Sequence, residues 1–328
     1  VGVVKGAGVD DTVLCLISGG GSALLIQPAG SLTLTDLQQT TQALLNAGST
    51  ITQVNTVRRH LSAVKGGQLA RWAAPARVFT LILSDVVGDP LPAIASGPTV
   101  PDPTSFADAW AVISQFQLEK VLPAAVVEYL QAGQRGEIID TPGPGDPVFE
   151  RVNNAIIGSN LIAAQAAVEA ARRQGFTARL LSTFIEGEAR EVGRVLAGLA
   201  KGLARGQADI SLPACLVLGG ETTVTIHGDG KGGRNQEMAL SAAIALAGWP
   251  GILIACLGTD GNDGPTDAAG AFADGTTVTR AVEAGLDPTE YLQRNDAYHF
   301  FKTIDDLIMT GPTNTNVNDL SLILVAPP

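Results

Sequence analysis

The sequence predicts an α/β protein with two domains and mainly parallel β-sheets. Short apolar runs alternate with longer helical patterns, which is the signature of βαβ units. The chain has 328 residues, which is long for one hydrophobic core and comfortable for two. Its 38 glycines gather in clusters after apolar runs, as expected where the backbone turns at the end of a strand and approaches another group closely.

The first half of the chain is predicted to form strands and helices, and it ends in a predicted linker. The segment 88–104 is rich in Pro and Gly and predicts an ordered but irregular loop. Residues 133–149 are dense in Gly, Pro and Asp and predict the linker, so the domain boundary is placed between residues 145 and 146. Strands are predicted at 12–17 and 78–84, and helices at 34–47, 54–72, 105–117 and 123–132.

The second half repeats this alternation. The predicted strands 214–218 and 222–227 flank Gly219-Gly220-Glu221, which suggests a hairpin-like or sharply bent pair. Further strands are predicted at 177–183, 252–257 and 320–325, and helices at 160–174, 187–204, 235–247, 276–284 and 288–293.

Composition excludes several classes of protein. A net charge of -11 and a pI near 4.7 argue against nucleic acid or an anionic membrane as the main partner. No apolar stretch is long enough to span a bilayer. The three cysteines each lie in an apolar run and predict buried thiols in a reducing compartment. The three histidines are dispersed, which argues against a zinc site.

Four predicted strand ends carry polar or glycine-rich turns, and ligands of open α/β sheets bind at such ends. The first turn consists of Ser18, Gly19, Gly20, Gly21 and Ser22. Successive glycine amides can form a nest for an oxyanion or a phosphate. A tight strand–helix turn without a ligand is the alternative.

Basic residues cluster on the predicted helix 54–72. Arg58 and Lys65 are seven residues apart and would share one face of this helix, with Ser62 between them. They could form a clamp for a carboxylate or a phosphate. The alternative is a solvated basic face that also includes Arg59, His60 and Arg71.

The second turn, Ser84–Asp89, places Asp85 and Asp89 just after a predicted strand. One of these carboxylates could hold Mg²⁺ together with substrate phosphates. Capping of the loop by aspartate is the alternative.

The third turn, Gly228–Glu237, matches G-x-G-x-x-G, but no acidic residue follows about twenty positions later to bind a ribose. The better interpretation is a loop that presents Lys231 and Arg234 to a transferring phosphoryl group at a helix N-terminus. An exposed loop without a function is the alternative.

The fourth turn, Gly258–Asp267, packs Asp260, Asp263 and Asp267 into ten residues. Binding of a magnesium nucleotide or of a substrate hydroxyl is the preferred interpretation. The terminal glutamate of an EF-hand is missing, and a rigid aspartate-rich turn is the alternative.

Six segments together resemble the two-domain glycerate 2-kinases, in which a glycerate-kinase N-terminal domain precedes a C-terminal MOFRL domain. The resemblance covers essentially the whole chain, and the segments follow in the family's order. They are SGGGSALL (18–25), NTVRRHLSAVKGG (55–67), SDVVGDPLPAIASGPTVPD (84–102), GGETTVTIHGDGKGGRNQE (219–237), GTDGNDGPTDAAG (258–270) and TGPTNTNVND (310–319).

The resemblance implies two three-layer α/β/α domains. Residues 1–145 would form a Rossmann-like domain with a parallel sheet, whose front part precedes Val1. Residues 146–328 would form the second domain, with a mixed sheet and the MOFRL region at about 213–325.

The implied reaction is transfer of the γ-phosphoryl group of ATP to the 2-hydroxyl of D-glycerate, with Mg²⁺, in a cleft between the domains of a cytoplasmic enzyme. The resemblance leaves open whether the protein forms a homodimer. Arg234 corresponds to an active-site arginine of the family, whereas the family's active-site lysine lies ahead of the segment matched here.

The implied site residues fall into three groups. Lys231 and Asp260 join Arg234 as catalytic residues, and Asp89, Asp263 and Asp267 are candidate metal ligands. Substrate or phosphate would be bound by the turn 18–22 and by Arg58, Lys65, Asp85, Glu221, Asn235 and Glu237.

Two other functions compete with the kinase. One is an NAD(P)H-dependent hydroxypyruvate reductase, a name given to relatives in this family, against which the missing ribose-binding acid speaks. The other is a non-catalytic sensor of organic acids, against which the retained Arg234 speaks.

Overall fold

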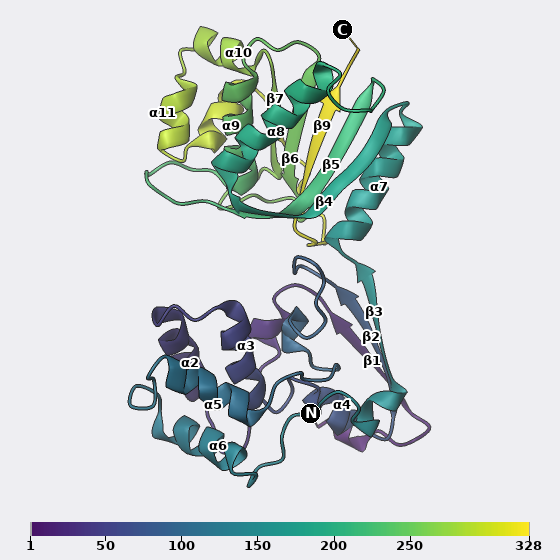
Figure 1. Ribbon diagram of the computed structural model, residues 1–328, viewed down its shortest axis with the longest axis vertical. Helices are drawn as coiled ribbons and strands as arrows, with labels where there is room; N and C mark the ends of the chain where they lie inside the picture. Colours follow the sequence, from purple (N-terminus) through teal and green to yellow (C-terminus); the bar gives the residue numbers. More distant parts are fainter. Residues whose placement is uncertain (1, 328) are drawn as a thin grey trace. The chain divides into compact units, whose positions relative to one another are not determined.

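The computed structural model describes residues 2–327, which form two compact units (Figure 1). The first unit ends at Ile157 and the second begins at Gly158. Each unit has its own β-sheet and its own clusters of buried apolar side chains. Each therefore has a hydrophobic core of its own.

The first unit contains a three-stranded sheet in the order β1-β2-β3, together with a group of helices. β1 and β2 run parallel, with Ile17 opposite Ile82. The turns that follow these two strands therefore leave the same edge of the sheet. The elements are η1 (Val4–Gly6), β1 (Thr12–Ile17), α1 (Gly21–Leu24), α2 (Leu34–Asn46), α3 (Ile51–His60), α4 (Gln68–Ala73), β2 (Arg77–Leu83), η2 (Ile94–Ser96), α5 (Phe106–Gln115), α6 (Ala124–Gln134), η3 (Pro147–Arg151) and β3 (Val152–Gly158).

The helices α2, α3, α5 and α6 pack around a core that includes the fully buried Val57 and Leu130. Three of these helices begin with capping boxes, in which Thr33, Thr50 and Ser105 accept a bond from the backbone three residues later. Each box satisfies amide groups that a helix start would otherwise leave unpaired. Local sequence thus fixes where these helices begin.

One face of the first sheet is packed and positions a loop at its edge. Ile17 and Ile82 lie in a buried cluster with Ile94 of η2. On the opposite face, Leu16 is 71% exposed and Phe79 is 41% exposed. The packed face thus holds η2 beside the strands, close to the turn that follows β1.

The single helix predicted over 54–72 is wrong, because the chain forms α3 and α4 with a break between them. Gly66 and Gly67 lie in this break with φ of +55° and +77°. Such left-handed conformations are typical of glycine beyond a helix end. A Cβ at Gly66 would come within 2.8 Å of the Asp102 carboxylate. Leu61 stays buried in the break, which explains why the apolar spacing resembled one continuous helix.

The second unit contains a mixed sheet in the order β4-β5-β9-β6-β7-β8. β4 and β5 are parallel, and the remaining neighbours are antiparallel. The elements are α7 (Asn160–Arg173), β4 (Thr177–Glu188), α8 (Ala189–Ala204), β5 (Ala214–Thr223), α9 (Arg234–Leu246), β6 (Ile252–Gly258), β7 (Gly270–Asp274), α10 (Thr277–Glu283), α11 (Pro288–Gln293), α12 (Ala297–Thr303), β8 (Leu307–Ile308) and β9 (Asp319–Val325).

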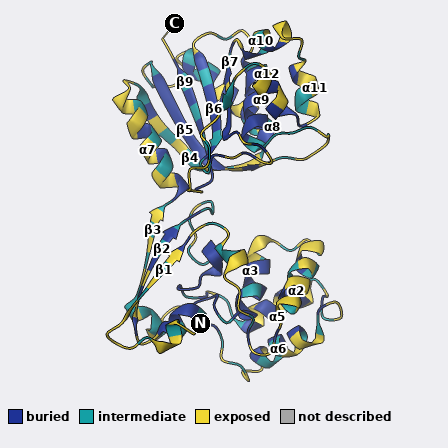
Figure 2. Ribbon diagram, turned by 180° about the vertical axis from the view of Figure 1, so that it is seen from behind, coloured by how far each residue is buried: buried dark blue, intermediate teal, exposed yellow. Residues whose placement is uncertain are grey.

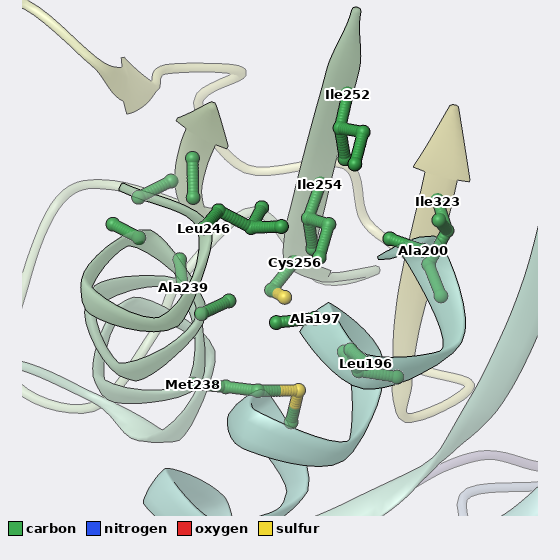
Figure 3. Close-up of a cluster of buried hydrophobic side chains, with 14 of the residues drawn as sticks. Leu196, Ala197, Ala200, Met238, Ala239, Leu246, Ile252, Ile254, Cys256 and Ile323 are labelled. Carbon is green, nitrogen blue, oxygen red and sulfur yellow. The ribbon is translucent and has the colours of Figure 1, made fainter. Parts of the chain in front are cut away.

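Helices cover both faces of this sheet. α7 packs on one face, and α8 and α9 lie together on the other (Figures 1 and 2). The larger core lies under α8 and α9, where Met238 and Leu196 approach Cys256 and Ile254 of β6 (Figure 3). This packing places the start of α9 at the end of the sheet where β5 and β6 finish.

The hairpin predicted around Gly219 is wrong, because Ala214–Thr223 is one strand paired on both sides. The glycines serve close packing instead of a turn. A Cβ at Gly219 would overlap the Asn160 side chain, and one at Gly220 would overlap the Ile185 backbone.

Besides the short helices η1, α1, η2 and η3, the sequence did not predict β3, β7, β8 or α12. β3 and β7 contain asparagine, glycine or alanine in place of a run of β-branched residues, so their strand signal is weak. The predicted class, an α/β protein with a parallel first sheet and a mixed second sheet, is confirmed. Among residues 2–327 there is no helix of the length and apolarity needed to cross a membrane.

Candidate active site

Arg58 and Lys65 meet at the turn after β1, although the helix that was expected to align them is broken. Arg58 donates to the Ser22 hydroxyl at 3.1 Å. The Lys65 ammonium donates to the Ser22 carbonyl at 2.8 Å and to the Ala95 carbonyl at 3.4 Å. The break after α3 folds Lys65 back onto this turn. The predicted pair is therefore brought together by the loop and not by helical periodicity.

The other basic residues of this segment have structural partners. Arg59 forms a buried ion pair with Asp102 at 2.9 Å. The ring of buried His60 lies 3.1 Å from Asp140. Arg58 and Lys65 form no ion pair with any carboxylate of the described residues. The interpretation of this segment as a solvated basic face is wrong for Arg59 and His60, which are buried.

The loop around Ser96 supplies the remaining polar groups of this cluster. The hydroxyls of Ser22 and Ser96 lie 2.8 Å apart, and Ser96 donates to Asn55 at 3.3 Å. Ala95 and Ser96 have φ of +51° and +60°, which strains residues with a Cβ. Strain of this kind gathers at ligand sites. Asn55 and Ser96 were not among the predicted site residues, although both lie in the segments that carry the family resemblance.

A cavity of about 400 Å³ opens above these groups. Its floor contains Ser22, Arg58 and Lys65. Burial, together with the charge of Arg58, lowers the pKa of Lys65 to about 8. Two adjacent cations without a carboxylate partner, one of them 1% exposed, form a site that favours an anion.

The remaining predicted residues of the first unit lie near this edge of the sheet. Ser18, Gly19 and Gly20 form the turn after β1, and Gly21 and Ser22 begin α1. Asp85 and Asp89 lie in the loop after β2 and are partly buried. Because β1 and β2 are parallel, both loops leave the same edge. Neither aspartate lines the cavity.

In the second unit, Arg234 is held between two carboxylates at the start of α9. Its guanidinium forms an ion pair with Asp319 and another with Glu221 at 2.9 Å. Asn318 donates to the second oxygen of Glu221 at 3.0 Å. Burial by itself lowers the pKa of Arg234, but the hydrogen bond and charge of Asp319 outweigh it and raise that pKa. Arg234 therefore stays charged in a fixed orientation.

The glycine-rich loop before Arg234 is held against another segment of its own unit. A Cβ at Gly228 or Gly230 would come within 2.5 Å of the Arg294 carbonyl oxygen. The Asn295 side-chain oxygen accepts hydrogen bonds from the backbone amides of His227 and Gly228 at the start of this loop. The glycines therefore permit close contact with residues 294–297.

Lys231 does not line the pocket that Arg234 lines. Its ammonium lies 4.6 Å from the centre of the Tyr298 ring. The Tyr298 hydroxyl donates to Asp267 at 2.7 Å. The structure thus brings Lys231 and Asp267 together through Tyr298, apart from the predicted partner Arg234.

Asp263 caps α9. Its carboxylate accepts the backbone amides of Asn235 at 3.1 Å and Gln236 at 2.8 Å. These are the amides that were expected to attract a phosphate, so part of the positive end of the helix is already neutralised. Burial raises the pKa of Asp263 to about 6, against the lowering effect of these bonds. Glu237 is also buried and bonded, to Arg190 and Asn295.

The raised pKa of Asp263 predicts a pH-dependent stability. The folded protein binds more protons than the unfolded chain between about pH 4 and pH 6, so the contribution of Asp263 to the free energy of unfolding falls across this range and stays low above it. In Asp263→Asn this dependence should vanish, so the stability difference between wild type and variant should shrink by about 2 kcal/mol from pH 4 to pH 7. Urea unfolding of both proteins at several pH values measures this difference. A stability difference that grows with pH would contradict the raised pKa of Asp263.

A cavity of about 570 Å³ is lined by Arg234 and three acidic side chains, those of Glu237, Asp260 and Asp263. One Asp260 oxygen accepts the Asn262 amide at 2.9 Å. Among residues 2–327 there is no group of three or more His, Cys, Asp or Glu side chains placed to hold a metal ion. Asp319 completes the Arg234 cluster and was missed, because it stands 85 residues further along the chain.

The fold and these two cavities define the class of protein, which is an α/β protein whose cavities carry the cations that anionic groups require. Residues 1–131 match the family described as "Domain of unknown function (DUF4147)", and residues 214–319 match the MOFRL family. A protein of Agrobacterium vitis named "Putative hydroxypyruvate reductase" is 47% identical over 98% of this chain and 72% of its own length. The D-glycerate 2-kinase of Thermotoga maritima is 43% identical over 96% of this chain and 73% of its own length.

The comparison with solved structures also finds a glycerate kinase. The crystal structure of glycerate kinase from Thermotoga maritima matches with a TM-score of 0.92 at 42% identity, and the match covers 99% of this chain and 75% of that one. The chain belongs to the glycerate kinase family.

Proposed function

We propose that this protein transfers the γ-phosphoryl group of ATP to the 2-hydroxyl of D-glycerate. The observation that carries the proposal is Arg234, fixed between two carboxylates on a cavity wall, in a chain 43% identical to proteins named glycerate 2-kinase. Phosphoryl transfer needs positioned groups and neutralised charge more than covalent chemistry by the protein. An oriented arginine in a partly buried site supplies such charge.

Each group at the two sites has a part in this reaction. Arg234 stabilises the charge on the transferring phosphoryl group. Asp260 lines the same cavity, and in this proposal it accepts the proton of the substrate hydroxyl. Arg58 and Lys65 bind an anionic group of the reactants.

Magnesium would neutralise phosphate charge in this reaction. The predicted ligands do not form a site that holds the ion by themselves, because Asp263 caps α9, Asp267 binds Tyr298 and Asp89 lies in the other unit. The described residues thus fit an ion held chiefly by the nucleotide phosphates.

The reductase is the weaker candidate. The loop 228–233 packs against residues 294–297 at the positions where a dinucleotide motif leaves room for a pyrophosphate. Incubation with D-glycerate and Mg-ATP, followed by ³¹P NMR, should show 2-phosphoglycerate. NADH oxidation with hydroxypyruvate and no consumption of ATP would establish the reductase instead.

The lowered pKa of Lys65 predicts the alkaline limb of the activity profile. Lys65 loses its charge as the pH rises through about 8, so kcat/KM should fall above that pH. Lys65→Met should lower kcat/KM at pH 7 and remove this limb. A coupled assay from pH 6.5 to 9.5 tests both, and an unchanged limb in the variant would refute the role of Lys65.

A further inference from the structure

The cavity above Arg58 and Lys65 extends well beyond the anion site on its floor. It measures about 400 Å³, which is in the range of pockets that enclose ligands much larger than a three-carbon acid. Its walls come from α2 and from the segment that follows the turn after β1. A group considerably larger than glycerate can therefore occupy it.

The charge of this cavity distinguishes it from the cavity in the second unit. Its lining contains two cations and no carboxylate, in a chain with a net charge of -11. The Arg234 cavity has one cation and three acidic side chains. A polyphosphate binds where cations are uncompensated, so the phosphates of a nucleotide favour the first cavity.

The walls suit a planar ring with polar edges. Ile26 and Leu34 are partly exposed apolar side chains at the opening, and Leu37 lies deeper. Gln38, four residues after Leu34, presents an amide on the same face of α2, and Gln42 follows one turn later. Apolar side chains can cover the face of a base, and amides can bond its edge.

We infer that this cavity is the nucleotide site, with the base between α2 and Ile26 and the phosphates at Arg58 and Lys65. The inference rests on the proposed kinase function and assigns its nucleotide to the first unit. The position of Lys65 supports this orientation, because two backbone carbonyls hold its ammonium at the cavity lining beside Arg58, where the two charges attract a phosphate.

The experiment places a negative charge at the opening of the cavity. Leu34→Glu is the test variant and Leu45→Glu is its control, because both leucines lie on α2 and are 47% and 52% exposed. Leu45 does not line the cavity. ADP binding is measured by calorimetry without metal, and the KM values for ATP and D-glycerate by a coupled assay.

Leu34→Glu should weaken ADP binding at least about tenfold and raise the KM for ATP, while the KM for glycerate stays near the wild-type value. Leu45→Glu should bind ADP like the wild type. Unchanged ADP binding in Leu34→Glu, or a rise in the glycerate KM alone, would overturn the inference and assign the cavity to the acid. If ADP binds as expected but glycerate is not phosphorylated, the proposed function fails and the nucleotide site stands.

Discussion

Arg234→Ala should lower kcat by about a thousandfold or more, the scale on which an arginine that faces a transferring phosphoryl group acts. Two carboxylates orient this guanidinium, so the charge is preorganised before the substrate binds. Arg234→Lys should recover little activity, because an ammonium cannot bond Asp319 and Glu221 in the same planar geometry. A coupled assay at saturating ATP and glycerate measures kcat.

Arg280→Ala is the matched control for this prediction. Arg280 also pairs with two carboxylates, Asp306 and Asp274, and its side chain is about as exposed as that of Arg234. It lines neither cavity described here. The control should lose some stability and keep kcat. A kcat for Arg234→Ala within about tenfold of the control would show that Arg234 is only a structural residue.

Asp102→Ala should destabilise the first unit by about 3–5 kcal/mol, because it leaves the Arg59 guanidinium buried without its partner. The Asp102 carboxylate is fully buried and also accepts the Thr104 amide at 2.9 Å and the Thr141 hydroxyl at 3.2 Å. One side chain thus holds together α3, the segment 102–104 before α5 and the segment near residue 141. Urea unfolding followed by tryptophan fluorescence measures the loss.

Glu137→Ala is the control for Asp102→Ala. Glu137 forms an ion pair with Arg135, but both side chains are more than half exposed, and solvent screens the interaction. The midpoint of unfolding should therefore hardly change. If Asp102→Ala behaved like this surface variant, the buried pair would have no part in holding α3.

The residues of the first cavity illustrate how a prediction can be confirmed for the wrong reason. The sequence indicated that Arg58 and Lys65 would lie together, on one face of a helix. They do meet, but only because the helix ends at His60 and the segment between α3 and α4 brings Lys65 back to Ser22. Periodicity could not show this break, since the buried side chains of the loop continue the helical spacing.

Charged residues that look alike in the sequence differ in the side chains that they contact in the structure. Nothing in the local pattern distinguishes Arg59 from Arg58, yet one is neutralised by Asp102 and the other faces a cavity. In the same way Lys231 follows Gly230 in a motif that suggested catalysis, and its side chain lies over Tyr298. These outcomes depend on contacts between residues far apart in the chain.

The sequence by itself determined the class of fold, the helix starts fixed by capping boxes such as that at Thr33, and Arg234 as the first candidate residue. Each of these is encoded in residues that follow one another closely. The tertiary structure alone decided that Asp319 pairs with Arg234, that Asp263 caps α9 and that Ser96 reaches Ser22. These contacts join segments 27 to 85 residues apart, and only packing of the whole unit brings such segments within bonding distance.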